Sequence, residues 1–310
     1  MTVTQYLLIF ARRILLVLGA VAAFHVALGI RPAFASEPTI REYDHIRTAL
    51  HGTGEPAAVL IPGMSTPGAV WDDTVAELSD EMRLLVVEVR GMEGGRTPAN
   101  EGPGMMAGIV ADLSADLAAR GLPPARIVGH SFGGLLALQF GLDHPGQAES
   151  LLVIDALPFF GTVFAERATL ASIEPQAARM RDMLLAQAET IRAAAAKGTD
   201  NPAGGAGMSL IPAQQLRIAN WSLKADPAVV AQALYEDMQT DLRAQIGDLS
   251  VPLTVLYQAH QAPDLARARY QADYAALPGS NLVPVERTSH FIMFDRPELV
   301  HAEIVRGAQR

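Results

Sequence analysis

Ser131 lies in a short sequence bracketed by glycines, Gly129-His130-Ser131-Phe132-Gly133, that could present a nucleophile. An apolar run at 125–128 precedes it, and a nearly continuous apolar run at 135–142 follows it. If the first run is a strand and the second a helix, the chain turns sharply at Ser131, and the two glycines leave room for that turn. The hydroxyl would then be exposed at the N-terminus of a helix. We expect Ser131 to be a nucleophile; the other interpretation is a tight turn with a passive serine.

A serine hydroxyl is a weak nucleophile at neutral pH and needs a neighbouring base, a task for which histidine is best suited. His290 follows an apolar run at 282–285 that we expect to be the last strand. It should therefore lie at the carboxyl edge of a parallel sheet, where sites form. We expect His290 to be the base rather than a surface-loop histidine. His130 is expected to pack against the sheet or to hydrogen-bond to it.

The composition excludes several other kinds of site. The chain has 310 residues, of which 50% are hydrophobic and 18% charged, the balance of a protein with a packed core. It has no cysteine, which excludes disulfides, thiol nucleophiles and cysteine metal sites. A net charge of −9 argues against nucleic acid as a partner. The sequence has neither a His-Glu-x-x-His motif nor a dinucleotide fingerprint, so we expect no metal and no cofactor.

Apolar runs of the buried-strand type alternate with helical patterns along most of the chain. The runs stand at 57–61, 84–89, 125–128, 151–154, 253–257 and 282–285. Stretches such as 107–119 and 135–142 have apolar residues at helical spacing. This alternation predicts an α/β fold with a mostly parallel, doubly wound sheet. Within 107–119, Asp112 and Asp116 are one turn apart, and we expect both on the exposed face.

One long segment breaks this alternation. Between about 158 and 248 we expect no strand, whereas the Ala- and Leu-rich runs at 175–196 and 227–245 predict helices. A glycine-rich connector at 198–207 joins them. The interpretation is a helical cap inserted at about 158–248 into one domain that spans 36–310. Cap side chains such as Phe160 and Met180 could line an apolar acyl pocket or form the core of the cap.

The first 35 residues are expected to be a secretory signal peptide. Residues 1–35 contain no Asp or Glu, Arg12-Arg13 precedes the apolar run 14–30, and Ala33-Phe34-Ala35 follows it. This is the order of a positive region, an apolar region and a cleavage site. We therefore expect an exported protein, periplasmic or secreted. The alternative is a retained membrane anchor at residues 14–30.

The sequence around these features resembles the α/β-hydrolase family over nearly the whole chain after residue 35. Residues 129–133 look like its nucleophile elbow. Leu60-Ile61-Pro62-Gly63-Met64, with Trp71 downstream, resembles the loop that supplies an oxyanion-hole amide. Residues 87–91 resemble the strand-end Arg-Gly segment, and residues 289–291 before Asp295 resemble the catalytic-histidine loop. The resemblance implies a serine hydrolase whose cap shapes the pocket, with the backbone N–H groups of Met64 and Phe132 as the oxyanion hole.

The acid that would orient His290 is left open between two residues. The family usually places it after the penultimate strand, but there this chain reads Gln258-Ala259-His260-Gln261, and the first carboxylate downstream is Asp264. Some members place the acid after the strand that follows the elbow helix, which here is Asp155. Each has another explanation, because Asp264 starts a helix and aspartates commonly end strands. We take Asp155 as the first candidate and Asp264 as the alternative.

The expected function is that of an exported serine hydrolase acting on a small-molecule acyl substrate. It would cleave a small or medium carboxylic ester, or a related acyl compound, through a Ser131 acyl-enzyme. Similar sites also carry out carbon–carbon bond hydrolysis or cofactor-free peroxidation, and a non-catalytic ligand-binding protein is a third possibility. Dehalogenase and epoxide hydrolase chemistry are disfavoured, since similar enzymes of those types have Asp where this chain has Ser131.

Overall fold

The structure is a computed structural model that describes residues 37–55, 57–198 and 202–307. The segment 1–35, for which the sequence predicts a signal peptide, lies outside the described residues. In the part of the chain that is described, no helix is long and apolar enough to cross a membrane.

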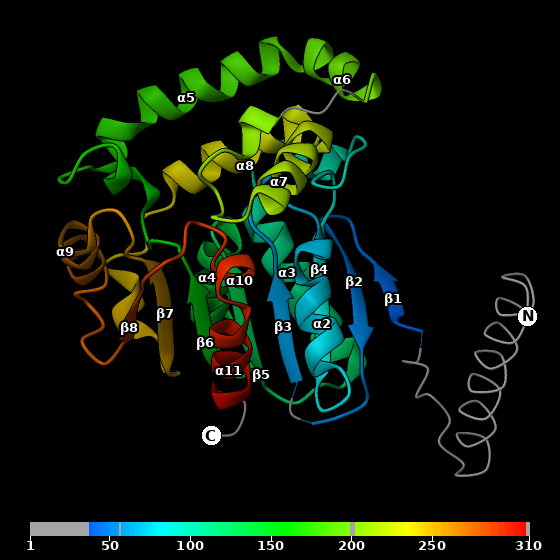
Figure 1. Cartoon of the computed structure of the whole chain (residues 1–310), viewed down its shortest axis with the longest axis vertical. Helices are drawn as coiled ribbons and strands as arrows, with labels where there is room; N and C mark the ends of the chain where they lie inside the picture. Colours follow the sequence, from blue (N-terminus) through cyan, green and yellow to red (C-terminus); the bar gives the residue numbers. More distant parts are fainter. Residues whose placement is uncertain (1–36, 56, 199–201, 308–310) are drawn as a thin grey trace, which may run out of the picture. The chain divides into compact units, whose positions relative to one another are not determined.

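An eight-stranded sheet forms the centre of the described domain (Figure 1). Its order is β1-β2-β4-β3-β5-β6-β7-β8, and all neighbours from β4 to β8 are parallel. The central strands β3, β5 and β6 are almost wholly buried, as strands covered by helices on both faces must be. The mostly parallel sheet that the alternation predicts is therefore confirmed. The strands are β1 Thr39–Glu42, β2 Ile46–His51, β3 Ala57–Ile61, β4 Arg83–Val89, β5 Ala125–His130, β6 Ala148–Ile154, β7 Leu253–Gln258 and β8 Asn281–Val285.

The two strands at the N-terminal edge are not predicted by the sequence pattern. β2 pairs antiparallel with both β1 and β4, and neither edge strand is a continuous apolar run. They cover one side of α3. Asp116, expected on the exposed face of this helix, is fully buried and accepts hydrogen bonds from Tyr43, Thr48 and Arg120. The expectation for Asp116 is wrong because the strands that cover it are not evident in the sequence.

Helices cover both faces of the sheet. Figure 1 shows α3 and α4 on one face and α2 and α11 on the other. One core cluster joins α3 and α4 to the sheet, for example through Ile109 and Leu135, and a second includes Trp71 and Ile304. The helices outside the cap are α2 Asp72–Leu78, α3 Met105–Arg120, α4 Phe132–Asp143, α9 Pro263–Asp273, α10 Ile292–Asp295 and α11 Pro297–Gly307, with the short 3-10 helices η1 Gly68–Trp71 and η2 Pro98–Asn100.

The cap is the segment between β6 and β7, in which the described residues form helices and no strand. Figure 1 shows these helices together at one end of the sheet. The predicted run 175–196 is two helices, the first of which begins earlier, at a capping box formed by Thr169 and Ser172. α7 is not predicted, although Pro212 at its first position is a helix-start signal. The helices are α5 Leu170–Ala186, α6 Ala188–Ala196, α7 Pro212–Lys224 and α8 Pro227–Gln239, with η3 Phe160–Val163, η4 Pro202–Gly205 and η5 Gln245–Asp248.

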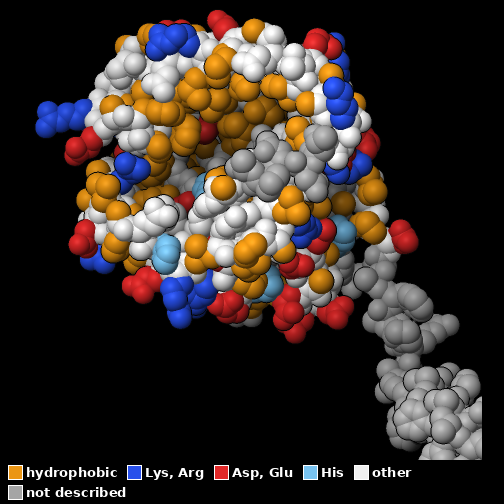
Figure 2. All heavy atoms as spheres, turned by 45° about the horizontal axis from the view of Figure 1, so that its top comes forward, with side chains coloured by type: hydrophobic (Ala, Val, Ile, Leu, Met, Phe, Trp, Pro, Cys, Tyr) orange, Lys and Arg blue, Asp and Glu red, His pale blue; other side chains and the backbone are white. Residues whose placement is uncertain are grey.

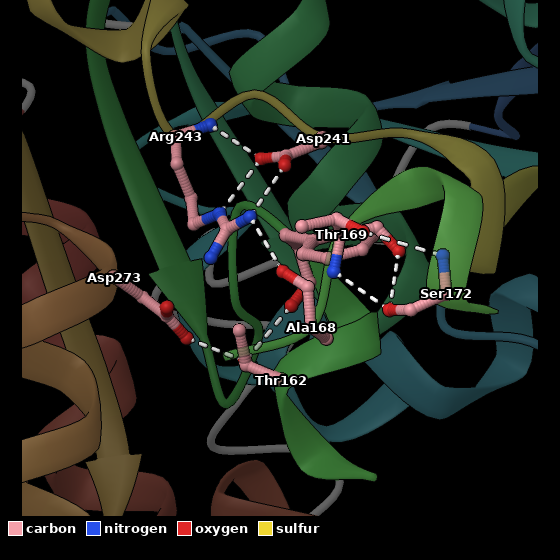
Figure 3. Close-up of polar contacts among 8 residues, drawn as sticks. Thr162, Ala168, Thr169, Ser172, Asp241, Arg243 and Asp273 are labelled. Carbon is pink, nitrogen blue, oxygen red and sulfur yellow. Dashed lines mark hydrogen bonds and ion pairs between the residues drawn. The ribbon is translucent and has the colours of Figure 1, made fainter. Parts of the chain in front are cut away.

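Polar contacts join the two ends of this helical segment to each other and to α9 (Figure 3). Arg243, which follows α8, pairs with Asp241 at 2.6 Å and donates to the Ala168 carbonyl, just before α5, at 3.1 Å. Thr162 in η3 donates to the Asp273 carboxylate of α9 at 2.6 Å. Both connections of the cap are therefore held in place close to the carboxyl ends of β6 and β7.

Candidate active site

Ser131 occupies the sharp turn between β5 and α4. Its backbone has φ 54° and ψ −125°, a conformation that non-glycine residues adopt only under strain. The Ser131 N–H donates to the Ile154 carbonyl at 2.9 Å, and the Ser131 carbonyl accepts from the Gly134 N–H at 2.7 Å. These contacts hold the strained turn against β6 and α4, and Ser131 lines a cavity.

The two glycines of the motif are required by close backbone contacts. A Cβ at Gly129 would lie 2.0 Å from the Gly133 carbonyl oxygen. A Cβ at Gly133 would lie 2.4 Å from the Pro62 carbonyl oxygen. Any side chain at either position would push the start of α4 away from the sheet, so the spacing of the glycines follows from the turn itself.

His290 and Asp155 form a hydrogen bond of 2.7 Å between Nδ1 and Oδ2. Asp155 directly follows β6, and its Oδ1 accepts from the Gln258 N–H at 3.0 Å and the Tyr270 hydroxyl at 3.1 Å. Only 9% of the Asp155 side chain is exposed. Because the carboxylate accepts the proton on Nδ1, the neutral imidazole has Nε2 free to act as a base.

Asp264, the alternative acid, lies elsewhere. It is exposed in the first turn of α9, the place that its helix-start explanation predicts. Within the described ranges, no hydrogen bond or ion pair connects it to His290. The structure therefore brings Asp155, and not Asp264, to the imidazole.

Ser131 and His290 line the same cavity. The Ser131 hydroxyl forms no hydrogen bond to another residue of the described chain. Hydrogen bonds between a nucleophile and its base are often long without substrate and tighten when it binds. The arrangement therefore fits a nucleophile and a base that come into hydrogen-bonding contact on a bound substrate.

His130 is fully buried, but its hydrogen-bond partner is not the sheet, contrary to one of the two expectations for it. Its Nε2 lies 3.1 Å from the His290 carbonyl oxygen, and because a carbonyl only accepts, Nε2 carries the proton. Burial and the neighbouring His290 lower the pKa of His130 well below its ordinary value, so the ring is neutral. His130 thereby connects the turn at Ser131 to the loop that carries His290.

Two backbone N–H groups beside Ser131 are available to a ligand in the cavity. Phe132 is the first residue of α4, so its N–H has no helical partner. The Met64 N–H, in the loop after β3, donates to no other described residue. Further along this loop, the Gly68 N–H donates to the Glu88 carboxyl at 2.5 Å, and burial raises the pKa of Glu88 to about 8.

Asp295 connects the His290 loop to the cap. Its Oδ2 accepts from the Ser289 N–H at 2.7 Å. Its Oδ1 accepts from the Ser209 hydroxyl at 2.6 Å and the Leu210 N–H at 2.9 Å. The Asp295 carboxylate therefore hydrogen-bonds both to the loop that carries His290 and to the cap segment before α7. Through this carboxylate, the cap supports the position of His290.

Ser131, His290 and Asp155 line a cavity of about 460 Å³ that lies between the sheet and the cap. Figure 2 shows a hollow with mostly hydrophobic walls and acidic atoms visible inside it. Phe160 lines the cavity, whereas Met180 packs against the core of the cap. The apolar lining includes Leu157, Phe160, Val163, Met208 and Leu234, and the charged lining outside the His290–Asp155 pair consists of Asp237 and Arg269. Within the described ranges, no group of three or more His, Asp or Glu side chains could hold a metal ion.

Tyr270, Asp295 and Asp237 are not singled out as site residues by the sequence. Tyr270 reaches Asp155 only because α9 packs beside β7, and it stacks on Tyr257 of that strand with ring centroids 4.2 Å apart. Asp237 is a polar residue on a helix, a position that is usually solvated. The available signal is weak: Asp237 follows Leu234 by three residues, so the two share one face of α8.

Comparisons with known proteins agree with this arrangement. Residues 58–303 match the sequence model of the alpha/beta hydrolase family. Pimeloyl-(acyl-carrier protein) methyl ester esterase of Edwardsiella ictaluri is 26% identical over 254 residues, which is 80% of this chain and 91% of that protein. "Putative carbamate hydrolase RutD" of Variovorax paradoxus is 33% identical over 113 residues, a match to 34% of this chain and 41% of that protein's length.

A solved structure shows the same fold. The enol-lactonase from Burkholderia xenovorans LB400 superimposes with a TM-score of 0.67 at 19% identity, covering 88% of this chain and 100% of that one.

Proposed function

Because the chain belongs to the α/β-hydrolase family, we propose that it is a serine hydrolase that cleaves a small or medium carboxylic ester, or a related acyl compound, through an acyl-enzyme on Ser131. The observation that carries the proposal is the hydrogen bond from His290 to Asp155 beside a cavity that Ser131 also lines. A methyl ester esterase and an enol-lactonase among the similar proteins support an ester as the substrate class.

Acylation begins when the Ser131 oxygen attacks the carbonyl carbon of the ester. His290 Nε2 takes the hydroxyl proton as the bond forms, and Asp155 stabilises the imidazolium through Nδ1. The carbonyl oxygen becomes an oxyanion, which the N–H groups of Met64 and Phe132 stabilise without reorganisation. The bond to the leaving oxygen then breaks, and that oxygen takes the proton from His290.

Deacylation repeats these steps with water. His290 takes a proton from a water molecule, whose oxygen attacks the acyl carbon. The ester bond to Ser131 breaks, and the serine oxygen recovers a proton from His290. The net reaction consumes one water and releases an alcohol and a carboxylic acid. A cavity of about 460 Å³ is in the range for small-molecule sites, which fits a substrate of small or medium size.

Hydrolysis of p-nitrophenyl esters with acyl chains of increasing length tests the proposal. We expect turnover by the wild-type protein and a loss of kcat by a factor of about 10⁴ or more in Ser131→Ala. Ser250→Ala, at an exposed serine outside the cavity, is the matched control and should retain activity. Turnover that survives in Ser131→Ala, or a folded wild-type protein that hydrolyses none of the esters, would contradict the proposal.

Export is a second part of the proposal, supported by the order of charge, apolar run and small residues within 1–35. Expression with this segment in a bacterial host should yield a processed protein outside the cytoplasm. N-terminal sequencing should then begin at Ser36. A full-length chain that stays in the membrane fraction would support the anchor instead.

A further inference from the structure

Asp237 is a buried carboxylate that lines the cavity from the cap. Its side chain lies on α8, and the residue is only 8% exposed. Leu234, one helical turn earlier, lines the same cavity, so this face of α8 forms part of the cavity wall. Within the described chain, Asp237 has no hydrogen bond and no ion pair.

The other buried acidic side chains of the described residues all have donors. Their contacts are Glu88 with the Gly68 N–H, Asp116 with Thr48, Asp226 with Arg192, Asp273 with Thr162 and Glu303 with Arg306. Burying a carboxylate costs free energy unless it is paired or hydrogen-bonded. Asp237 is therefore unusual in this protein, and its position at the cavity suggests that its partner is a ligand.

The charge around Asp237 indicates which kind of ligand would fit. Burial alone raises the pKa of Asp237 to about 7, and no charged group contributes to that shift. Arg269, the cationic side chain on the cavity lining, belongs to α9 and forms no ion pair with Asp237. Among the described residues, no ion pair joins the Asp237 carboxylate to a cationic side chain.

Resting on the proposed hydrolase function, we propose that Asp237 recognises a protonated amine or similar cationic group, so that the preferred substrates of this cavity are cationic acyl compounds. The ammonium N–H groups would donate to the carboxylate in place of the missing protein donors. The apolar neighbours Leu234 and Phe160 would contact the hydrocarbon that joins the cation to the ester. Asp237 is then a specificity residue, separate from the groups that act on the ester carbon.

Binding of a matched ligand pair tests this without turnover. Pentylammonium and 1-pentanol have similar shape and differ in charge, and Ser131→Ala protein would be titrated with each by calorimetry. At pH 8, above the raised pKa of Asp237, we expect pentylammonium to bind about 10- to 100-fold more tightly than pentanol, the range for hydrogen bonds to charged groups. Adding Asp237→Asn should abolish this preference. Asp182→Asn, at an exposed acid of α5 outside the cavity, should preserve it.

Equal or tighter binding of pentanol would overturn the proposal, since the Asp237 carboxylate would then not favour a cationic ligand. A preference for the amine that persists in Asp237→Asn would also overturn it. If adding Asp237→Asn prevents folding, the comparison of the two ligands on Ser131→Ala protein still tests the proposal, because equal binding of both overturns it. Ester turnover by wild-type protein with no amine preference overturns this inference only, whereas amine preference without any ester turnover supports Asp237 recognition and contradicts the hydrolase function.

Discussion

Replacing Glu88 with glutamine should change the pH dependence of stability in a way that can be calculated. Glu88 lies on β4 and is 6% exposed, and its carboxyl accepts the Gly68 N–H of the loop that also carries Met64. Burial raises the pKa of Glu88 from 4.5 to about 8, against the smaller opposing effect of that hydrogen bond. Two charged residues, Glu93 and Arg47, act on it with opposite signs.

A carboxyl whose pKa is raised by folding holds its proton more tightly in the folded state. Between pH 4.5 and about 8 the unfolded state therefore binds fewer protons, and the free energy of unfolding falls as the pH rises. The loss is about 1.4 kcal/mol per pH unit, or roughly 5 kcal/mol over the whole interval. The amide of Glu88→Gln would not titrate and would keep an oxygen that can accept the Gly68 N–H.

The assay is urea unfolding of wild type and Glu88→Gln at pH 5, 6, 7 and 8, followed by tryptophan fluorescence. The free energy of unfolding of the variant minus that of wild type should rise by about 1.4 kcal/mol with each pH unit. Glu81→Gln makes the same substitution at an exposed glutamate and is the control, which should not reproduce this rise. A flat difference for Glu88→Gln, or one that falls as the pH rises, would refute the reasoning.

Three further substitutions test the contacts around the candidate site. Asp155→Asn should lower kcat for esters by about 10³- to 10⁴-fold because the imidazole loses its acceptor, whereas Asp264→Asn should change kcat little; the reverse order would assign the acid to Asp264. Tyr270→Phe removes one donor to Asp155 and should lower kcat by about 3- to 10-fold with little change in KM, and an unchanged kcat would show that this hydrogen bond does not matter. Asp295→Ala leaves two backbone N–H groups without their acceptor and should lower the free energy of unfolding by about 2–4 kcal/mol in urea titrations; an unchanged midpoint would contradict this.

The central strands could be predicted from the sequence because each is a continuous apolar run. The run at 57–61 coincides with β3, and the sharp turn at Ser131 follows from a strand, a helix and two glycines. β1 and β2 could not be recognised, since short and partly exposed edge strands lack such a run. The burial of Asp116 could not be predicted for the same reason.

The choice between Asp155 and Asp264 depends on three-dimensional packing rather than on local sequence. Asp155 meets the Gln258 N–H because β6 and β7 are parallel, with Ile154 opposite Leu256. The loop that carries His290 is bonded to Asp295, which in turn accepts a hydrogen bond from Ser209 of the cap. Neither the register nor those contacts have a signature in the sequence.

Asp237 illustrates the same point for the cavity. A polar residue on a helix is usually solvated, and Leu234 on the same face is only a weak sign of burial. In the structure α8 packs against α5 and α3, and Asp237 is buried. Partners contributed by distant segments determine both its environment and its access to a ligand.

Covalent labelling with a fluorophosphonate, followed by mass spectrometry of the intact protein and of its peptides, tests the central claim most directly. Only a serine activated by a base reacts readily with such a reagent. The account predicts one adduct per chain on the peptide that contains Ser131, and none in Ser131→Ala. A folded wild-type protein that forms no adduct, or forms it on another serine, would contradict the account.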